Sequence, residues 1–132
     1  MSDPATKFAN FRSAYARLSE GIAQLDENND LAADGVIQRF EFTFELSWKT
    51  LKAVFEDEGL TGLNSPKTVL REAFAAGLIS DEELWLDMLN DRNNTVHMYS
   101  EQLAKEICRN IQTRYVLALG QLLEGIKARL GV

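Results

Sequence analysis

One short segment of the sequence gathers the side chains best suited to chemistry. It reads "DRNNTVHMY" and holds the only histidine of the chain, His97, with Arg92 five residues before it and Tyr99 two residues after it. An imidazole can accept or donate a proton near neutral pH, and a guanidinium stays charged and can hold two phosphate oxygens at once. Together these groups favour chemistry on phosphate esters. The adjacent Asn93 and Asn94 could orient such a ligand, or they could only cap and break a helix.

A ribonuclease that works without a metal needs more proton-transfer groups than this segment supplies by itself. It requires a base for the 2′-hydroxyl, stabilisation of a charged phosphorane and an acid for the leaving group. The chain has one histidine. Either another residue type provides the second proton-transfer group, or a twofold homodimer brings two copies of His97 together.

Purely structural interpretations exist for the same residues. A lone histidine after a helix end commonly caps carbonyl groups or packs on a neighbour. Arg92 could pair with Asp87 or Asp91, or favour the helix C-terminus through the helix dipole. Tyr99 could be a half-buried aromatic residue with its hydroxyl in water. The only cysteine, Cys108, has the context of a small buried hydrophobic residue.

The elements that must position this segment are helices, because apolar residues recur at steps of three and four. The first stripe consists of Phe8, Phe11, Tyr15, Leu18, Ile22 and Leu25. A polar turn at 26–30 separates it from a second stripe of Ile37, Phe40, Phe44, Trp48, Leu51 and Phe55. Additional apolar positions flank the second stripe, which predicts a central helix buried on more than one side. The final stripe is Leu103, Ile107, Ile111, Tyr115, Leu119, Leu122, Ile126 and Leu130.

Capping residues mark the boundaries between the second helix and the last. Gly59 is expected to end the second helix, and Ser65 followed by Pro66 has the pattern of an N-cap and first helical residue. Ser80 and Glu83, three residues apart, predict a capping box that opens a helix leading into the Arg92–Tyr99 segment. The sequence therefore predicts an all-α fold: a four-helix up-and-down bundle with a short helical insertion between the second and last long helices. Residues 1–132 are expected to form a single domain.

Composition limits the classes of function. The 132 residues carry a net charge of −6, which argues against broad, non-specific binding to nucleic acid, so any RNA contact must be local. The pattern of Cys and His residues excludes a zinc site, and we expect neither a metal nor another cofactor. The N-terminus lacks a signal-peptide pattern and no apolar run is long enough for a membrane span, which predicts a cytoplasmic protein that does not bind membranes. The core stripes show no polar residues, which disfavours a small-molecule pocket inside the bundle.

The pattern Arg-x-x-x-x-His-x-Tyr formed by Arg92, His97 and Tyr99 resembles the signature of the HEPN superfamily of helical domains. More narrowly, "QRFEFTFELSWKTLK", "SPKTVLREAFAAGLI" and "WLDMLNDRNNTVHMY" resemble the nucleotidyltransferase substrate-binding protein family, in the same order along the chain. The resemblance implies the four-helix bundle with its insertion, assembled as a homodimer. It also implies a partner, a minimal nucleotidyltransferase that carries the catalytic carboxylates.

Two functions follow from this resemblance. In one, the protein is a ribonuclease toxin with Arg92 and His97 as its cleavage site, and the transferase is an antitoxin that attaches AMP to Tyr99. In the other, the protein is a non-catalytic subunit that presents a substrate to the transferase. Asn93 matches a polar residue that often follows the arginine in HEPN motifs and is a candidate supporting residue. Further candidates, for the wall of a groove at the site, are Glu41, Trp48 and Lys49. Because the chain is acidic, RNA binding requires that Arg92, Lys49, Lys52 and neighbouring cations converge in a groove of the dimer.

Overall fold

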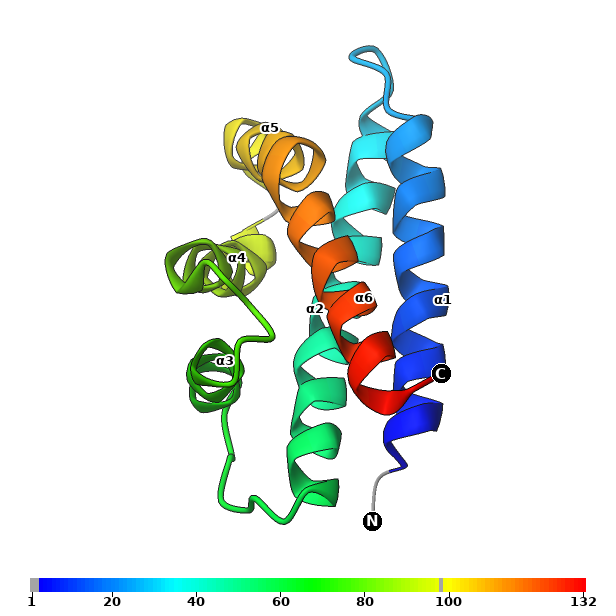
Figure 1. Cartoon of the computed structure of the whole chain (residues 1–132). Helices are drawn as coiled ribbons and strands as arrows, with labels where there is room; N and C mark the ends of the chain where they lie inside the picture. The colour runs from blue at the N-terminus through cyan, green and yellow to red at the C-terminus, as the bar shows by residue number, and fades with distance from the viewer. Residues whose placement is uncertain (1–2, 98) are drawn as a thin grey trace.

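The chain forms a bundle of α-helices in the computed structural model, which describes residues 3–97 and 99–132. Within that part of the chain every regular element is helical, so the predicted all-α class is confirmed. The α-helices are α1 (Pro4–Ala23), α2 (Asp30–Asp57), α3 (Pro66–Ala75), α4 (Glu82–Asn94), α5 (Glu101–Asn110) and α6 (Val116–Leu130). Figure 1 shows α1 and α2 side by side along the length of the molecule, while α3, α4 and α5 are seen nearly end-on and therefore cross that axis.

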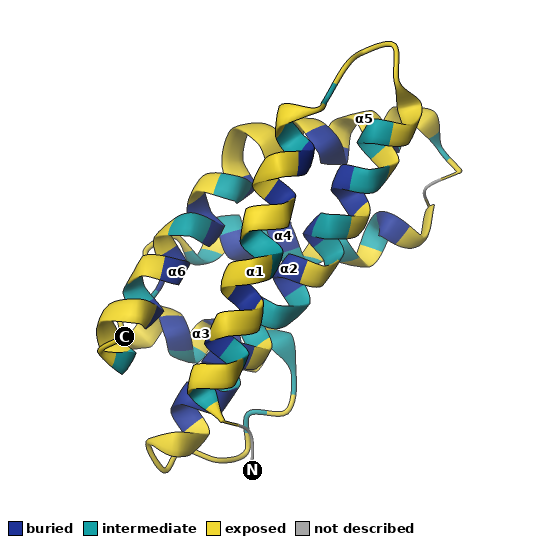
Figure 2. Cartoon of the chain, turned by 90° about the vertical axis from the view of Figure 1, so that its right-hand side faces the viewer, coloured by how far each residue is buried: buried dark blue, intermediate teal, exposed yellow. Residues whose placement is uncertain are grey.

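Helix α2 is the centre of the bundle, as its two-sided apolar pattern predicts. It contacts α1, α3, α4, α5 and α6, and Figure 2 shows its buried residues where it faces its neighbours. The expectation of core stripes without polar residues is wrong for this helix, because Thr43, Ser47 and Thr50 are fully buried. Their hydroxyls donate to backbone carbonyl groups three or four residues earlier in α2, so burial leaves none of them unpaired. Thr50 also reaches the carbonyl oxygen of Lys7 in α1, at 3.2 Å.

The ends of α3 and α4 show where local capping rules hold and where they fail. Ser65 caps α3 and Pro66 is its first residue, as predicted. Helix α4, in contrast, is capped by Asp81, whose carboxylate accepts the N–H of Leu84 at 3.0 Å, and the predicted box of Ser80 and Glu83 is wrong. Aspartate is as good an N-cap as serine, and here the helix simply starts one residue later.

The last long helix is continuous but not uniform. A π-helical turn, Ile111–Tyr115, joins α5 to α6, and α6 packs against α1. The helix ends at Gly131, whose φ of +72° is the left-handed conformation typical of a C-terminal cap. Cys108 is buried in this helix, and desolvation raises its pKa, in agreement with its interpretation as a small hydrophobic residue.

No described helix is both long enough and apolar enough to cross a lipid bilayer.

Candidate functional site

The predicted segment lies at the junction of α4 and α5, as expected, but more of it is helical than the sequence suggested. Arg92, Asn93 and Asn94 form the last turn of α4, and the α-helix ends at Asn94. A short 3₁₀ helix, Thr95–His97, follows, and Ser100 caps α5 by accepting the N–H of Leu103. The Arg92–Tyr99 segment is therefore held between two capped helices. Asn93 is exposed and makes no side-chain hydrogen bond to another residue in the described part of the chain.

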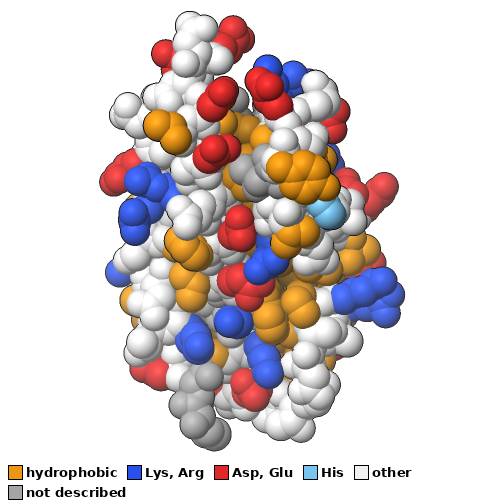
Figure 3. All heavy atoms as spheres, turned by 180° about the vertical axis from the view of Figure 1, so that it is seen from behind, with side chains coloured by type: hydrophobic (Ala, Val, Ile, Leu, Met, Phe, Trp, Pro, Cys, Tyr) orange, Lys and Arg blue, Asp and Glu red, His pale blue; other side chains and the backbone are white. Residues whose placement is uncertain are grey.

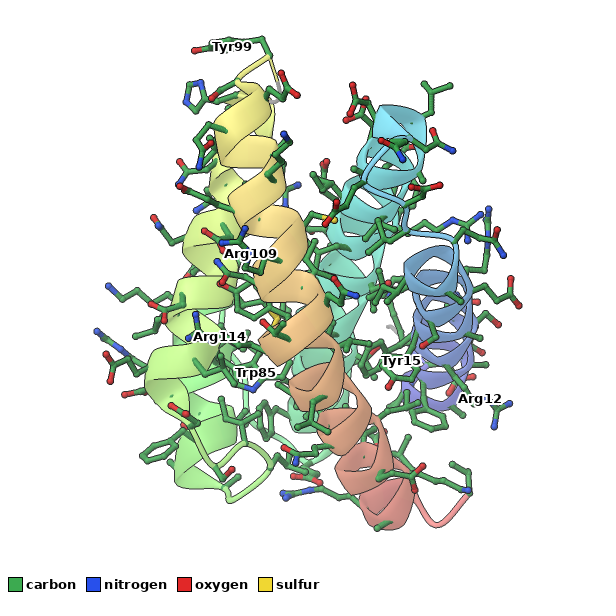
Figure 4. The ribbon with its side chains drawn as sticks, turned by 90° about the horizontal axis from the view of Figure 1, so that it is seen from above. Arg12, Tyr15, Trp85, Tyr99, Arg109 and Arg114 are labelled. Atoms are coloured by element: carbon green, nitrogen blue, oxygen red, sulfur yellow. The ribbon has the colours of Figure 1, made fainter. Side chains whose placement is uncertain are left out.

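His97 and Tyr99 contact each other. The Tyr99 hydroxyl lies 3.3 Å from Nδ1 of His97, and the two rings meet edge to face with their centroids 5.8 Å apart. This is a long hydrogen bond, and which atom donates depends on the histidine tautomer. Tyr99 is 85% exposed, which is unlike the half-buried aromatic of the structural interpretation. Figure 4 shows it at the far end of the junction between α4 and α5, pointing away from the bundle. Its hydroxyl is open to a reactant from outside.

Arg92 points to α2, where its Nε lies 3.2 Å from Oε1 of Glu45. The Nε atom is buried and has no aligned hydrogen bond to a described residue, so the contact is ionic. The two expected partners are engaged elsewhere: Asp87 accepts a bond from Arg114, and Asp91 accepts bonds from Asn110 and Tyr115.

Of the predicted groove residues, Lys49 contacts this ion pair and Trp48 contacts Lys49. Lys49 lies 3.7 Å from Glu45 and also sits over the ring of Trp48, 6.0 Å from its centroid. Trp48 is packed against the core, and its buried Nε1 has no hydrogen-bond partner among the described residues. Glu41 lies one turn earlier on α2, and within the described part of the chain it forms no ion pair.

The convergence of Arg92, Lys49 and Lys52 in a dimer groove stays a prediction. Lys49 and Arg92 converge on the carboxylate of Glu45, whereas Lys52 forms no ion pair with a described residue. Sequence reasoning missed Glu45, although it stands four residues from both Glu41 and Lys49 and hence on the same side of α2. Figure 3 shows acidic and basic side chains together on this face, with the histidine near hydrophobic side chains at its edge.

Two surface hollows are separate from this site. One, of about 270 Å³, is lined by Ser13, Ala14, Arg17, Arg39, Phe42 and Leu46. The other, of about 520 Å³, is lined by Tyr15, Leu117, Gly120, Gln121, Leu123 and Glu124. Neither contains a residue of the Arg92–Tyr99 segment. Among the described residues no cluster of three or more His, Cys, Asp and Glu side chains is placed to hold a metal ion.

The family described as "Nucleotidyltransferase substrate binding protein like" matches residues 6–128, which is nearly the whole chain. The chain belongs to this family. A relative of known sequence is the "Probable ribonuclease HepT" of Haemophilus influenzae, which is 29% identical over 89% of each chain. A protein from Thermus thermophilus whose crystal structure is known is 41% identical, with a TM-score of 0.73 over 91% of this chain and 98% of that one.

The chain also shares its fold with a HEPN toxin. The tri-AMPylated HEPN toxin of Shewanella oneidensis, solved in complex with an MNT antitoxin, is 20% identical to this chain. Its TM-score is 0.77 over 97% of this chain and 99% of that one. This likeness establishes the HEPN fold, and the Arg-x-x-x-x-His-x-Tyr pattern of the superfamily lies at the junction of α4 and α5.

Proposed function

We propose that the protein is a metal-independent ribonuclease with Arg92 and His97 at its cleavage site, and that a partner nucleotidyltransferase silences it by attaching AMP to Tyr99. The observation that carries the proposal is the exposed Tyr99 hydroxyl, 3.3 Å from His97 Nδ1. Support comes from the Haemophilus influenzae relative, described as a probable ribonuclease, and from the Shewanella oneidensis toxin, which is AMPylated and bound to its antitoxin.

In the cleavage reaction the ribose 2′-hydroxyl attacks the adjacent phosphorus. His97 takes the hydroxyl proton, the bond from phosphorus to the 5′-oxygen breaks, and an acid returns a proton to that oxygen. Arg92 holds the phosphate oxygens and stabilises the negative charge of the phosphorane. To do so its guanidinium must exchange the Glu45 carboxylate for phosphate. Asn93, exposed on the same helical turn, is a candidate for orienting the RNA.

A homodimer would supply the second proton-transfer group, because a twofold axis near the site places one His97 opposite its copy. The apolar side chain of Val96, which precedes His97 and is 71% exposed, supports this assembly, because exposed apolar side chains are common on a surface that another protein covers.

Silencing follows from the position of Tyr99. Its hydroxyl oxygen would attack the α-phosphorus of ATP bound to the transferase, pyrophosphate would leave, and a proton would be lost from the hydroxyl. The new phosphodiester places bulk and a negative charge beside His97, where the phosphate of RNA has to bind. The cleavage site and the modification site then lie in the same segment.

A second candidate function is a non-catalytic subunit that presents a substrate to the transferase. The ion pair between Arg92 and Glu45 favours it, because the guanidinium is already engaged in the unliganded chain. The family's own description also names substrate binding. Under this alternative the protein cleaves no RNA, and its variants change only the rate of the partner's transfer reaction.

The two functions are separated by an RNA cleavage assay without divalent metal. The unmodified protein, checked by mass for attached AMP, is incubated with mixed RNA beside Arg92→Ala and His97→Ala. Arg109→Ala is the matched control, because Arg109 is an exposed arginine on the neighbouring helix α5. Cleavage that is lost in the first two variants and kept in the control supports the ribonuclease. No cleavage by unmodified wild-type protein supports the substrate-binding subunit.

A further inference from the structure

The π-turn in the last helix changes which side chains share a face. The N–H of Val116 donates to the carbonyl oxygen of Ile111, five residues earlier, where an α-helix would bond four residues back. In an α-helix, residues five apart lie about 140° apart around the axis, since each residue turns about 100°. A π-turn brings residues five apart onto the same side. Asn110 and Tyr115 are five apart and span this turn.

Both of these side chains bond to one carboxylate oxygen of Asp91 on α4. Nδ2 of Asn110 donates to Oδ2 at 3.0 Å, and the Tyr115 hydroxyl donates to the same atom at 2.6 Å. Tyr115 is buried, and its ring stacks on Phe40 with centroids 5.6 Å apart. Burial, and then the bond to Asp91, raise the pKa of this hydroxyl, so it remains a donor at every physiological pH.

A second contact between α4 and the last helix lies one turn earlier on α4. Arg114, within the π-turn, donates to Oδ2 of Asp87 at 2.9 Å, and Asp87 and Asp91 are four residues apart and share one side of the helix. Figure 4 shows Arg114 between α4 and the last helix, with Tyr99 at the far end of the same pair of helices.

Asp91 directly precedes Arg92, and the two point in different directions. Asp91 is tied to the last helix, while Arg92 turns toward Glu45 on α2. The final turn of α4 is therefore held from two sides. If Asp91 were free, this turn could fray, as the ends of helices do, and the guanidinium would lose its fixed place.

We propose that the π-turn is a positioning device for the cleavage site: Asn110 and Tyr115 hold Asp91, and thereby fix the last turn of α4, from which Arg92 extends. None of the three touches RNA in this account, so they are positioning residues. The inference rests on the proposed ribonuclease function for its effect on cleavage, but the holding of Arg92 can be measured without RNA.

Tyr115→Phe tests the proposal because it removes the hydroxyl and keeps the stacked ring. In protein with ¹⁵N-labelled arginine, we expect the Arg92 Nε–H signal to broaden and to exchange faster with water than in the wild type. In the cleavage assay kcat should fall about tenfold to a hundredfold, the loss typical of a misplaced group, with KM changed less than about twofold. Asn110→Ala removes the longer of the two hydrogen bonds to Asp91. It should change the Arg92 signal and kcat in the same direction, but by less than Tyr115→Phe does.

Thr50→Val is the matched control. It also deletes a buried hydroxyl at nearly constant shape, but that hydroxyl bonds to carbonyl groups of α1 and α2. It should reduce stability without changing the Arg92 signal or kcat. An unchanged Arg92 signal in Tyr115→Phe, or an equal change in Thr50→Val, would overturn the positioning role. If unmodified wild-type protein cleaves no RNA, the proposed function fails, and the Arg92 signal alone decides whether the π-turn positions this residue.

Discussion

Replacing Glu45 by glutamine should tighten RNA binding, because the Glu45 carboxylate competes with phosphate for Arg92. The two charged groups are 3.2 Å apart, which corresponds to an attraction of about 1 kcal/mol in water and about 5 kcal/mol at an effective dielectric constant of ~20. Both side chains are partly exposed, at 29% and 31%. Solvent and the cost of ordering two side chains reduce the net value of such pairs to about 1 kcal/mol or less.

A net competition of about 1 kcal/mol corresponds to a change of about fivefold in Kd. We therefore expect Glu45→Gln to lower the Kd for RNA by up to about fivefold, with the effect shrinking as salt screens the charges. The assay is fluorescence anisotropy with a short RNA whose 2′-hydroxyl groups are methylated, so that binding is measured without cleavage.

Glu41→Gln is the control for this prediction. It makes the same change in net charge one turn earlier on α2, at a carboxylate that forms no ion pair within the described part of the chain. Its Kd should stay within about twofold of the wild type, since a charge without a contact acts only through solvent. An equal gain in both variants would mean that net charge alone governs binding. An unchanged Kd in Glu45→Gln would refute the competition for Arg92.

Further predictions concern stability and reactivity. Gly35→Ala in α2 should raise the free energy of unfolding by about 0.5–1 kcal/mol, because alanine favours a helix interior and no atom beyond the adjoining helical backbone lies within 4 Å of the new Cβ. Gly120→Ala should show no such gain, because its Cβ would lie 2.6 Å from the Tyr15 hydroxyl. Thermal unfolding measures the change in both variants. The Cys108 thiol is buried with a raised pKa, so a thiol reagent at neutral pH should modify it at least about tenfold more slowly in native than in denatured protein. Rapid modification of native protein, or equal gains in both glycine variants, would contradict this description of the packing.

The features that the sequence predicted are those encoded by neighbours along the chain. Apolar residues at steps of three and four placed the helices, and Ser65 followed by Pro66 marked the start of α3 correctly. The start of α4 was missed by one residue because Ser80 and Asp81 are both good N-caps and only the folded geometry selects between them. The sequence did not predict that Thr43 is buried, because its side chain is polar. Its burial is possible because the hydroxyl donates to a carbonyl oxygen of its own helix.

The features that the sequence did not predict depend on packing between helices. Glu45 and Arg92 are far apart along the chain, and nothing in the local pattern indicates that they meet. The spacing of apolar residues in the last helix did indicate the π-turn. Ile107, Ile111, Tyr115 and Leu119 follow one another at steps of four without an intervening step of three. That spacing is wider than the 3.6-residue period of an α-helix and favours a wider turn in this region.

The central claim is that one segment both cleaves RNA and receives the modification that stops cleavage. The most direct measurement follows one preparation of the protein, with Tyr99→Phe beside it, before and after incubation with its nucleotidyltransferase and ATP. Intact mass reports AMP addition, and a gel reports RNA cleavage. We expect wild-type protein to gain AMP and to lose cleavage in proportion, whereas Tyr99→Phe gains no AMP at this position and keeps cleaving. Modified wild-type protein that still cleaves, or unmodified protein that never does, would contradict it.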